Sequence, residues 1–294
     1  MAKIGVDLMG NDNSPKTLLT ALNELQLDSS TELVVFGLPE YKDLSRFEYV
    51  EALEFIEMDD HPLSALRRKK QASLCIGLKA LKEKKIDAFI SAGNTGSLVT
   101  GAKITLGTLP GILRPALLAR MPTKKEPVAV IDVGANVQVK ACHLVQFALL
   151  GTAFAKSHGI KKPRVGLLNI GSEASKGTTE LRIAYQELKE FPNSPFEFVG
   201  NIEGKSVFDG EVDVLITDGF TGNVFLKTAE GIASLLSSHL HYAEYPGAIL
   251  AGVQGIVIKC HGYSTPRAFS NAIAGAVQLV RSNFTEEIKK QIIR

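Results

Sequence analysis

Apolar residues along the chain repeat one unit: a short apolar run, a turn rich in glycine and small polar residues, and a segment with helical periodicity. The apolar runs cover residues 3–8, 86–91, 128–133, 164–170, 213–217 and 255–260. They are rich in β-branched residues and do not alternate with polar ones, which is typical of strands buried on both faces. Strands that alternate with helices predict a layered α/β fold, with a mostly parallel sheet flanked by helices.

The segments after these turns predict the helices. Pro15 marks a helix start, because a proline in the first turn lacks only an N–H that the helix does not use. The predicted helices cover about 15–27, 64–85, 140–157 and 178–189, with others after residue 96, from the 218–223 turn to about 238, and from about 266. In such sheets, ligands bind at the carboxyl ends of the strands, where these turns lie.

Composition and charge narrow the class of protein. The chain has 294 residues, 45% of them hydrophobic and 22% charged, which is ordinary for a globular protein. A net charge of +2 does not favour nucleic-acid binding. Three separate cysteines without a CxxC spacing indicate reduced thiols. The N-terminus has no signal-peptide pattern and no apolar run spans a bilayer, so we expect a soluble, cytoplasmic protein.

Several familiar sites are missing from the sequence. No GxGxxG follows the first strand, and the Walker-like segment 200–206 is one residue short and does not lead into a helix. There is no GxSxG, no HExxH and no paired His/Cys spacing for zinc. We therefore expect neither a metal nor an organic cofactor.

The turns themselves are suited to an anion. Glycines let backbone N–H groups approach a phosphate, and helix N-termini add partial positive charge. Turn formation and helix capping explain any one of these turns better. Several turns converging on one sheet edge favour an anion site, with phosphate as the best candidate. The candidate binding residues are Asp7, Gly10, Asn94, Thr95, Gly96, Asn136, Gly171, Glu173, Asp218, Thr221, Gly222, Asn223 and Ser264.

Three further residues could supply positive charge or a proton, namely Lys176, Lys259 and His261. Lys176 lies in a glycine-flanked turn, which favours a ligand contact. Lys259 ends an apolar strand, where a buried cation needs a partner such as an anionic substrate. Asp7 and Asp132 lie near strand ends, and either residue caps a neighbouring turn or orients a lysine.

The turns, in this order, resemble the bacterial phosphate acyltransferase (PlsX) family of phospholipid synthesis. The resemblance covers nearly the whole chain, and its most specific motifs are SAGNTG at 91–96, DVGAN at 132–136 and TDGFTGNV at 217–224. It implies transfer of a long-chain acyl group from acyl carrier protein (ACP) to inorganic phosphate, giving acyl phosphate. It also implies a homodimer and a peripheral contact at the inner face of the membrane. Residues 1–294 would then form one catalytic α/β domain, or two intimately packed lobes.

Phosphate is itself the nucleophile in that reaction, so no activated serine or cysteine is required. The resemblance implies charge stabilisation by Lys176 and Lys259 and proton transfer by His261. The sequence departs from the family in its first loop, 9–15, which lacks a second glycine and a histidine. The comparison with the family also predicts that a helical excursion, which in relatives is associated with the dimer and membrane contacts, is shortened here to residues 238–245.

Other interpretations stay open. A phosphotransacetylase that uses coenzyme A, a non-catalytic sensor of phosphate or ACP, and a decarboxylating dehydrogenase all share this kind of fold. The sequence does not contain the pattern of metal-binding aspartates that such a dehydrogenase would need. The basic run Arg67-Arg68-Lys69-Lys70 is best explained as a solvated helix face, with docking of an acidic carrier protein as the alternative.

Overall fold

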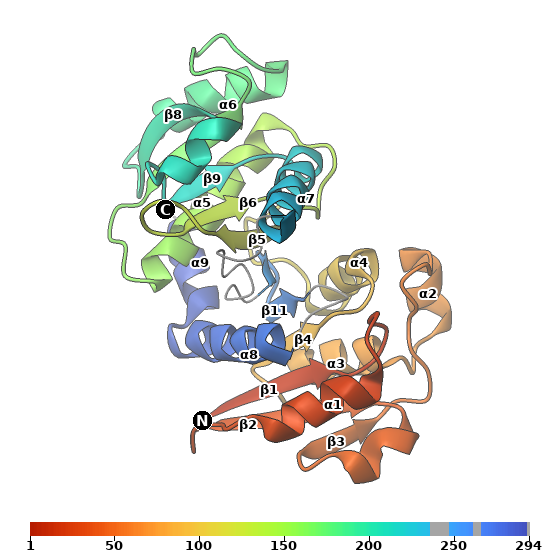
Figure 1. Cartoon of the computed structure of the whole chain (residues 1–294). Coiled ribbons are helices and arrows are strands. Elements are labelled where there is room, and N and C mark those ends of the chain that lie inside the picture. The colour runs from red at the N-terminus through yellow and green to blue at the C-terminus, as the bar shows by residue number, and fades with distance from the viewer. Residues whose placement is uncertain (236–246, 261–265, 293–294) are drawn as a thin grey trace. The chain divides into compact units, whose positions relative to one another are not determined.

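The structure, a computed structural model, describes residues 1–235, 247–260 and 266–292. The chain divides into two compact units, each assembled from segments that are distant in sequence. Unit 1 comprises Met1–Thr108 and Ala243–Ser282, and unit 2 comprises Leu109–Tyr242 and Asn283–Arg294. Each unit has a mostly parallel sheet with helices packed on it, which confirms the predicted α/β class (Figure 1).

The sheet of unit 1 has the strand order β3-β2-β1-β4-β11-β10. Its neighbouring strands are parallel except that β10 runs antiparallel to β11. The strands are β1 (Ala2–Asp7), β2 (Thr31–Gly37), β3 (Glu48–Glu51), β4 (Ala88–Ser91), β10 (Ala248–Ala251) and β11 (Ile256–Lys259). The central strands β4 and β11 are buried along their whole length, as their unbroken apolar runs predict.

The helices of unit 1 follow the turns. Their bounds are α1 (Pro15–Glu24), α2 (Pro62–Arg68), α3 (Ser73–Lys82), α4 (Thr95–Leu106) and α8 (Pro266–Arg281), with a 3-10 helix η1 (Pro39–Leu44). Helix α1 packs on α8, α3 packs on α4, and α3 and α8 both contact β1 and β4. These contacts bury the sheet and leave the turns at the carboxyl ends of β1, β4 and β11 to carry polar residues.

One predicted helix of unit 1 is wrong. The expected single helix over 64–85 is two helices, because α2 ends at Arg68 and α3 begins at Ser73. The residues between them pair with the segment after β3: the Leu53 N–H donates to the Gln71 carbonyl at 3.3 Å, and the Ser73 N–H donates to the Glu54 carbonyl at 3.1 Å. Backbone groups used in this pairing are lost to a continuous helix.

The sheet of unit 2 has the order β5-β6-β9-β7-β8. Strand β5 is antiparallel to β6, and the remaining pairs are parallel. The strands are β5 (Ala116–Met121), β6 (Val128–Ile131), β7 (Arg164–Asn169), β8 (Glu197–Glu203) and β9 (Val214–Ile216). The parallel core β6-β9-β7 therefore aligns three of the predicted turns at one edge of this sheet.

Helix α5 (Ala141–Ser157) is the central helix of unit 2. It contacts β6, β9, α6 (Thr179–Lys189) and α9 (Phe284–Ile292), and most of its side chains are buried. Helix α7 (Gly219–Leu235) packs on β6, and a 3-10 helix η2 (Gly204–Asp209) follows β8. Among the described residues, no helix has the length and apolarity needed to span a bilayer.

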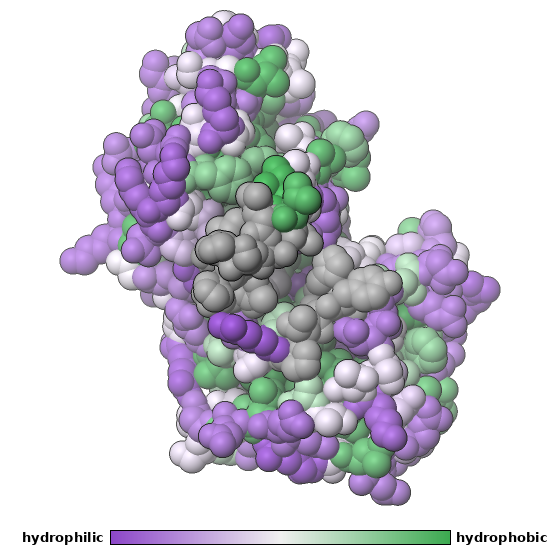
Figure 2. All heavy atoms as spheres, in the orientation of Figure 1, coloured by the Kyte–Doolittle hydropathy of each residue, from purple (hydrophilic) through white to green (hydrophobic). Residues whose placement is uncertain are grey.

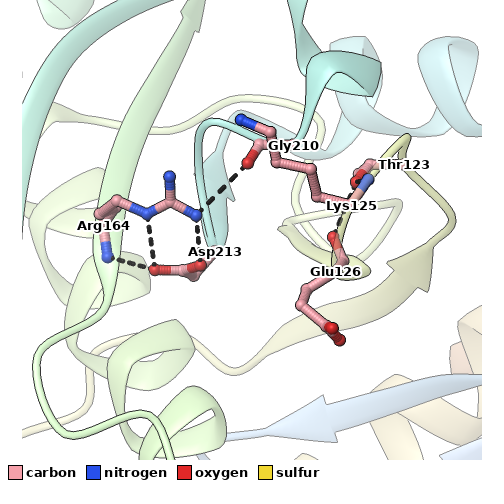
Figure 3. A network of polar contacts seen from close by, with 6 residues as sticks. All are labelled: Thr123, Lys125, Glu126, Arg164, Gly210 and Asp213. Atoms are coloured by element: carbon pink, nitrogen blue, oxygen red, sulfur yellow. Dashed lines mark hydrogen bonds and ion pairs between the residues drawn. The ribbon is translucent and has the colours of Figure 1, made fainter.

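An ion pair clamps the amino ends of β7 and β9. The guanidinium of Arg164 donates to both carboxylate oxygens of Asp213, at 3.2 and 2.8 Å, and the Arg164 N–H donates to the same carboxylate at 2.7 Å (Figure 3). The guanidinium also reaches the carbonyl of Gly210 at 3.4 Å. This network lies at the edge opposite the predicted turns, so it stabilises unit 2 without entering the candidate site.

Candidate functional site

Three buried polar side chains lie in a row where β1, β4 and β11 of unit 1 end. The strand registers pair Asp7 with Ser91 and Ser91 with Lys259. Paired residues of neighbouring parallel strands point to the same face of a sheet. Asp7 and Ser91 are 1% and 0% exposed, and Lys259 is 9% exposed. The sheet thus places a carboxylate, a hydroxyl and an ammonium side by side at its carboxyl edge.

Asp7 caps the first turn. Its carboxylate accepts from the Met9 N–H at 3.1 Å and from the Ser91 hydroxyl at 2.8 Å. Burial raises the pKa of Asp7 to about 6, although hydrogen bonds from Ser73, Ser91 and Met9 oppose the shift. Of the two predicted roles, the observed contacts are those of a turn cap.

Lys259 is held by main-chain carbonyls. Its ammonium donates to the carbonyl of Ala92 at 3.2 Å and to the carbonyl of Cys260. The sequence prediction that a buried lysine here needs partners is consistent with these contacts. The Ala92 contact ties the cation directly to the SAGNTG turn after β4.

Asn94 caps helix α4 and anchors a distant loop. Its side-chain oxygen accepts from the Ser97 N–H at 2.9 Å, and its amide donates to the carbonyls of Met58 and Asp60 at 2.8 and 3.1 Å. The side chain that the motif offered as a ligand therefore builds the turn. What the turn presents is Thr95 and the N-terminal N–H groups of α4, with their partial positive charge.

The first turn lies against the SAGNTG turn. Gly10 has φ +69°, and a Cβ there would lie 2.4 Å from the carbonyl oxygen of Ile56 and 3.7 Å from Cα of Gly93. Only glycine fits such a close approach at a positive φ. Gly10 is therefore a packing residue at the rim of this cluster.

In unit 2, Asp132 organises the turn after β6. Its buried carboxylate accepts from the N–H groups of Leu117, Gly134 and Ala135 at 2.9 to 3.1 Å, and from both nitrogens of Asn136. Burial raises the pKa of Asp132, and these donors act against that shift. The observed contacts again match the predicted turn cap.

The turn after β9 packs tightly on the Asp132 turn. The carboxylate of Asp218 caps α7 by accepting from the Thr221 N–H and hydroxyl, both at 2.8 Å. The amide of Asn223 donates to the Val133 carbonyl at 3.1 Å. A Cβ at Gly222 would lie 1.9 Å from the Asp132 carbonyl oxygen. The TDGFTGNV motif is thus largely accounted for by close contact between two turns.

The turn that carries Lys176 is held by two asparagines that the sequence analysis did not single out. Asn201 of β8 donates to the Glu173 carbonyl at 2.8 Å, and Asn169 of β7 donates to the Lys176 carbonyl at 3.2 Å. Lys176 is exposed, and its ammonium lies 3.9 Å from the Glu173 carboxylate. The position of Asn169 at the end of an apolar run was the available signal for that residue, whereas the mixed sequence of β8 gave no such signal for Asn201.

The structure groups the predicted site residues into two clusters, one in each unit. Ser91 joins the first cluster although it was not predicted, and its place as the last residue of β4 was the available signal. His261 and Ser264 lie outside the described residues. The first cluster holds Asp7, Gly10, Asn94, Thr95, Gly96 and Lys259; the second holds Asn136, Gly171, Glu173, Lys176, Asp218, Thr221, Gly222 and Asn223.

Comparison with known proteins identifies the family. The family described as "Fatty acid synthesis protein" matches residues 2–240 and 233–287. A phosphate acyltransferase of Chlamydia caviae is 42% identical over 312 aligned positions, which cover 97% of this chain and 98% of the relative. A phosphate acyltransferase of Thermotoga petrophila is 41% identical over 319 positions, covering 99% and 95%.

Solved structures with low sequence identity share the fold. A phosphotransacetylase (EutD) of Staphylococcus aureus superposes with a TM-score of 0.68 at 19% identity, covering 96% of this chain and 94% of that one. A branched-chain phosphotransacylase of Enterococcus faecalis gives 0.68 at 13% identity, covering 95% and 99%. The motifs, the fold and the near full-length relatives agree, and the chain belongs to the fatty acid synthesis protein family, together with the phosphate acyltransferases.

Proposed function

We propose that this protein transfers a fatty acyl group from acyl carrier protein to inorganic phosphate and so makes acyl phosphate for phospholipid synthesis. This proposal is based on the phosphate acyltransferases that are about 40% identical to this chain over nearly its full length. The clusters of buried polar groups at the carboxyl ends of the strands support it, because that edge is where α/β sheets bind ligands.

The reaction needs little from the protein beyond positioning and charge. A phosphate oxygen attacks the thioester carbonyl carbon, the carbon–sulfur bond breaks, and the phosphate proton ends on the carrier thiol. Phosphate and the developing oxyanion carry negative charge, so cations and oriented N–H donors stabilise them. No covalent enzyme intermediate is required.

Unit 1 offers such groups together. Lys259 contacts the Ala92 carbonyl at 3.2 Å, at the start of the turn that leads into α4. The side-chain oxygen of Asn94 accepts a hydrogen bond from the Ser97 N–H. The N–H groups of Thr95 and Gly96 come before that of Ser97 in the first turn of α4. We propose that these N–H groups and the Thr95 hydroxyl bind phosphate, with Lys259 balancing its charge.

Lys176 is a separate candidate in unit 2. Its ammonium is exposed, and among the described residues its ion-pair contact is a long one to Glu173, at 3.9 Å. Exposure leaves it free to contact a substrate, and the two asparagine hydrogen bonds hold its turn in place. We propose a charge-stabilising role for Lys176, to be tested separately from that of Lys259.

One assay tests the function. Palmitoyl-ACP is incubated with the protein with and without phosphate, and acyl phosphate is trapped with hydroxylamine. Phosphate-dependent release of the carrier thiol is expected. Turnover only with acetyl-coenzyme A would instead indicate a phosphotransacetylase, and binding without turnover would indicate a sensor.

Replacement of Lys259 by methionine tests the proposed phosphate site, because methionine keeps much of the apolar stem without the charge. We expect kcat/KM to fall by about 100-fold or more. Thermal unfolding of the variant separates this effect from misfolding. An unchanged kcat/KM would remove Lys259 from the mechanism.

Other expectations from the sequence stay predictions. These are the single catalytic domain, the homodimer, the cytoplasmic location and the peripheral contact at the inner membrane face. Light scattering tests the dimer, and cosedimentation with anionic vesicles tests the membrane contact. The shortened region, 238–245, lies outside the described residues.

A further inference from the structure

Helix α2 of unit 1 ends in a group of exposed cations. Arg67, Arg68 and Lys70 are exposed, and none of them forms an ion pair with another described residue. Lys69 differs, because its ammonium lies 2.5 Å from the carboxylate of Asp60. We call Arg67, Arg68 and Lys70 the α2 cations. Three unpaired charges on one short stretch are a candidate surface for an acidic partner.

The α2 cations stand on a helix that is tied to the candidate phosphate turn. Asn94 donates to the carbonyls of Met58 and Asp60, in the loop that leads into α2. A Cβ at Gly96 would lie 2.6 Å from Cγ of Pro62, the first residue of α2. The helix therefore begins in direct contact with the turn of α4 that we propose binds phosphate.

The surface of α2 is mixed rather than uniformly charged. Leu63 is 46% exposed and Met58, just before the helix, is 41% exposed. In Figure 2 the surface over α2, toward the right of the view, is mostly hydrophilic with small apolar areas between. Exposed apolar side chains ringed by charge are typical of protein interaction surfaces.

Helix stabilisation does not account for this arrangement by itself. Cations in a last turn interact favourably with the helix dipole, but each contributes only about 0.3–1 kcal/mol. Lys69, which neutralises Asp60, already places one cation near this end. Of the acidic residues nearby, Glu57 and Asp59 lie in the loop before the other end of α2 and Asp60 pairs with Lys69, whereas the Glu54 carboxylate accepts from the N–H of Gln71, next to Lys70.

We propose that the α2 cations form the docking surface for the acidic carrier protein that delivers the acyl thioester. The proposal rests on the proposed function, since it names where that substrate's protein part binds. A carrier seated on α2 lies next to the SAGNTG turn, so its flexible arm starts close to the phosphate. Complementary charge speeds such encounters, and salt screens it.

The test compares two substrates in two variants. The docking variant is Arg67→Glu combined with Arg68→Glu, and the substrates are palmitoyl-ACP and octanoyl-N-acetylcysteamine, a thioester without a carrier. The control is Lys79→Glu combined with Lys82→Glu, which makes the same charge change at two exposed positions in the last turn of α3. Thermal unfolding checks that both variants fold.

We expect kcat/KM for palmitoyl-ACP to fall at least tenfold in the docking variant and to stay near wild type in the control. Activity with the small thioester should be unchanged in both. In the wild type, kcat/KM for palmitoyl-ACP should fall as salt rises, and this dependence should flatten in the docking variant.

Two results would overturn the docking surface while leaving the function intact. One is a docking variant as active as wild type with palmitoyl-ACP, and the other is an equal loss with both substrates. If the wild type shows no phosphate-dependent turnover with either substrate, the proposed function is wrong, and the docking proposal is wrong with it.

Discussion

At the scale of single residues, the polar side chains of the motifs first of all build turns. Asn94, Asp132 and Asp218 each cap a turn or helix with hydrogen bonds of 2.7 to 3.1 Å. Fewer of the predicted site residues, among them Thr95 and Lys176, remain as candidates for contact with a substrate. Turn and helix capping therefore explains more of the polar motif residues than ligand binding does.

The raised pKa of Asp7 leads us to expect that the free energy of unfolding depends on pH. Its pKa of about 6 in the folded protein exceeds the ordinary value of 3.8. Between those values the unfolded chain has lost the proton that the folded protein keeps, so stability falls as pH rises from about 4 to 6. The loss is about 3 kcal/mol and levels off above pH 6. Urea unfolding over this pH range measures it.

Asp7→Asn removes the titrating group, so the variant should lose this fall in stability between pH 4 and 6. Asp12→Asn is the control, because Asp12 is an exposed carboxylate in the turn that follows β1. The assignment to Asp7 would not survive an Asp7→Asn variant that keeps the wild-type pH profile.

The close packing around Gly222 leads us to expect that a larger residue at this position destabilises the protein. Gly222→Ala brings a methyl group to 1.9 Å from the Asp132 carbonyl oxygen, a backbone atom that cannot easily move aside. We expect a loss of about 1–3 kcal/mol in the free energy of unfolding. Gly231→Ala in the same helix is the matched control, because nothing lies within 4 Å of its Cβ position. That variant should be stabilised by up to about 1 kcal/mol. Equal effects in chemical unfolding would contradict the prediction.

At the scale of elements, neighbouring strands support the turns at their ends. Asn169 of β7 and Asn201 of β8 hold the 171–177 turn from both sides, through the carbonyls of Lys176 and Glu173. Asn201 is 6% exposed, and its side-chain oxygen has no hydrogen-bond partner among the described residues. Its amide contact is therefore its visible contribution to this turn.

Asn201→Ala should loosen that turn. Loss of the hydrogen bond to Glu173 costs about 1 kcal/mol, and the backbone amides of 171–177 should exchange hydrogen faster. Hydrogen exchange read by mass spectrometry measures the effect. Val199→Ala, at an exposed position of the same strand, is the control and should leave the exchange unchanged.

At the scale of the whole molecule, the sheet of unit 2 carries a stabilising ion pair at one edge and the candidate turns at the other. In unit 2 the candidate turns follow the carboxyl ends of β6, β7 and β9, whereas the clamp between Arg164 and Asp213 holds the amino ends of β7 and β9. A change in the clamp should therefore alter stability and leave the chemistry as it is.

Asp213→Asn weakens the clamp while keeping its shape. We expect a loss of about 1–3 kcal/mol in unfolding free energy, since the lost hydrogen bonds join charged groups, with kcat/KM unchanged. Lys124→Ala is the control: it breaks an ion pair with Asp209 whose side chains are 77% and 44% exposed. Such exposed pairs contribute little, so this variant should stay near wild type in thermal unfolding. A fall in kcat/KM in the Asp213 variant would show that the two edges are coupled.

The sequence by itself determined the α/β class, six of the strands with the turns that follow them, and the polar residues that those turns carry; it did not predict β2, β3, β5, β8 or β10. These depend on local properties, namely apolar runs, glycine and helix-start residues, that each segment has wherever it lies. The tertiary structure decided what the polar groups do. Asp7 meets Ser91 across 84 positions, and Asn94 meets Met58 across 36, so no local pattern names those partners. Backbone hydrogen bonds between residues 53–54 and 71–73, which are also distant in sequence, end a helix that periodicity alone would have continued.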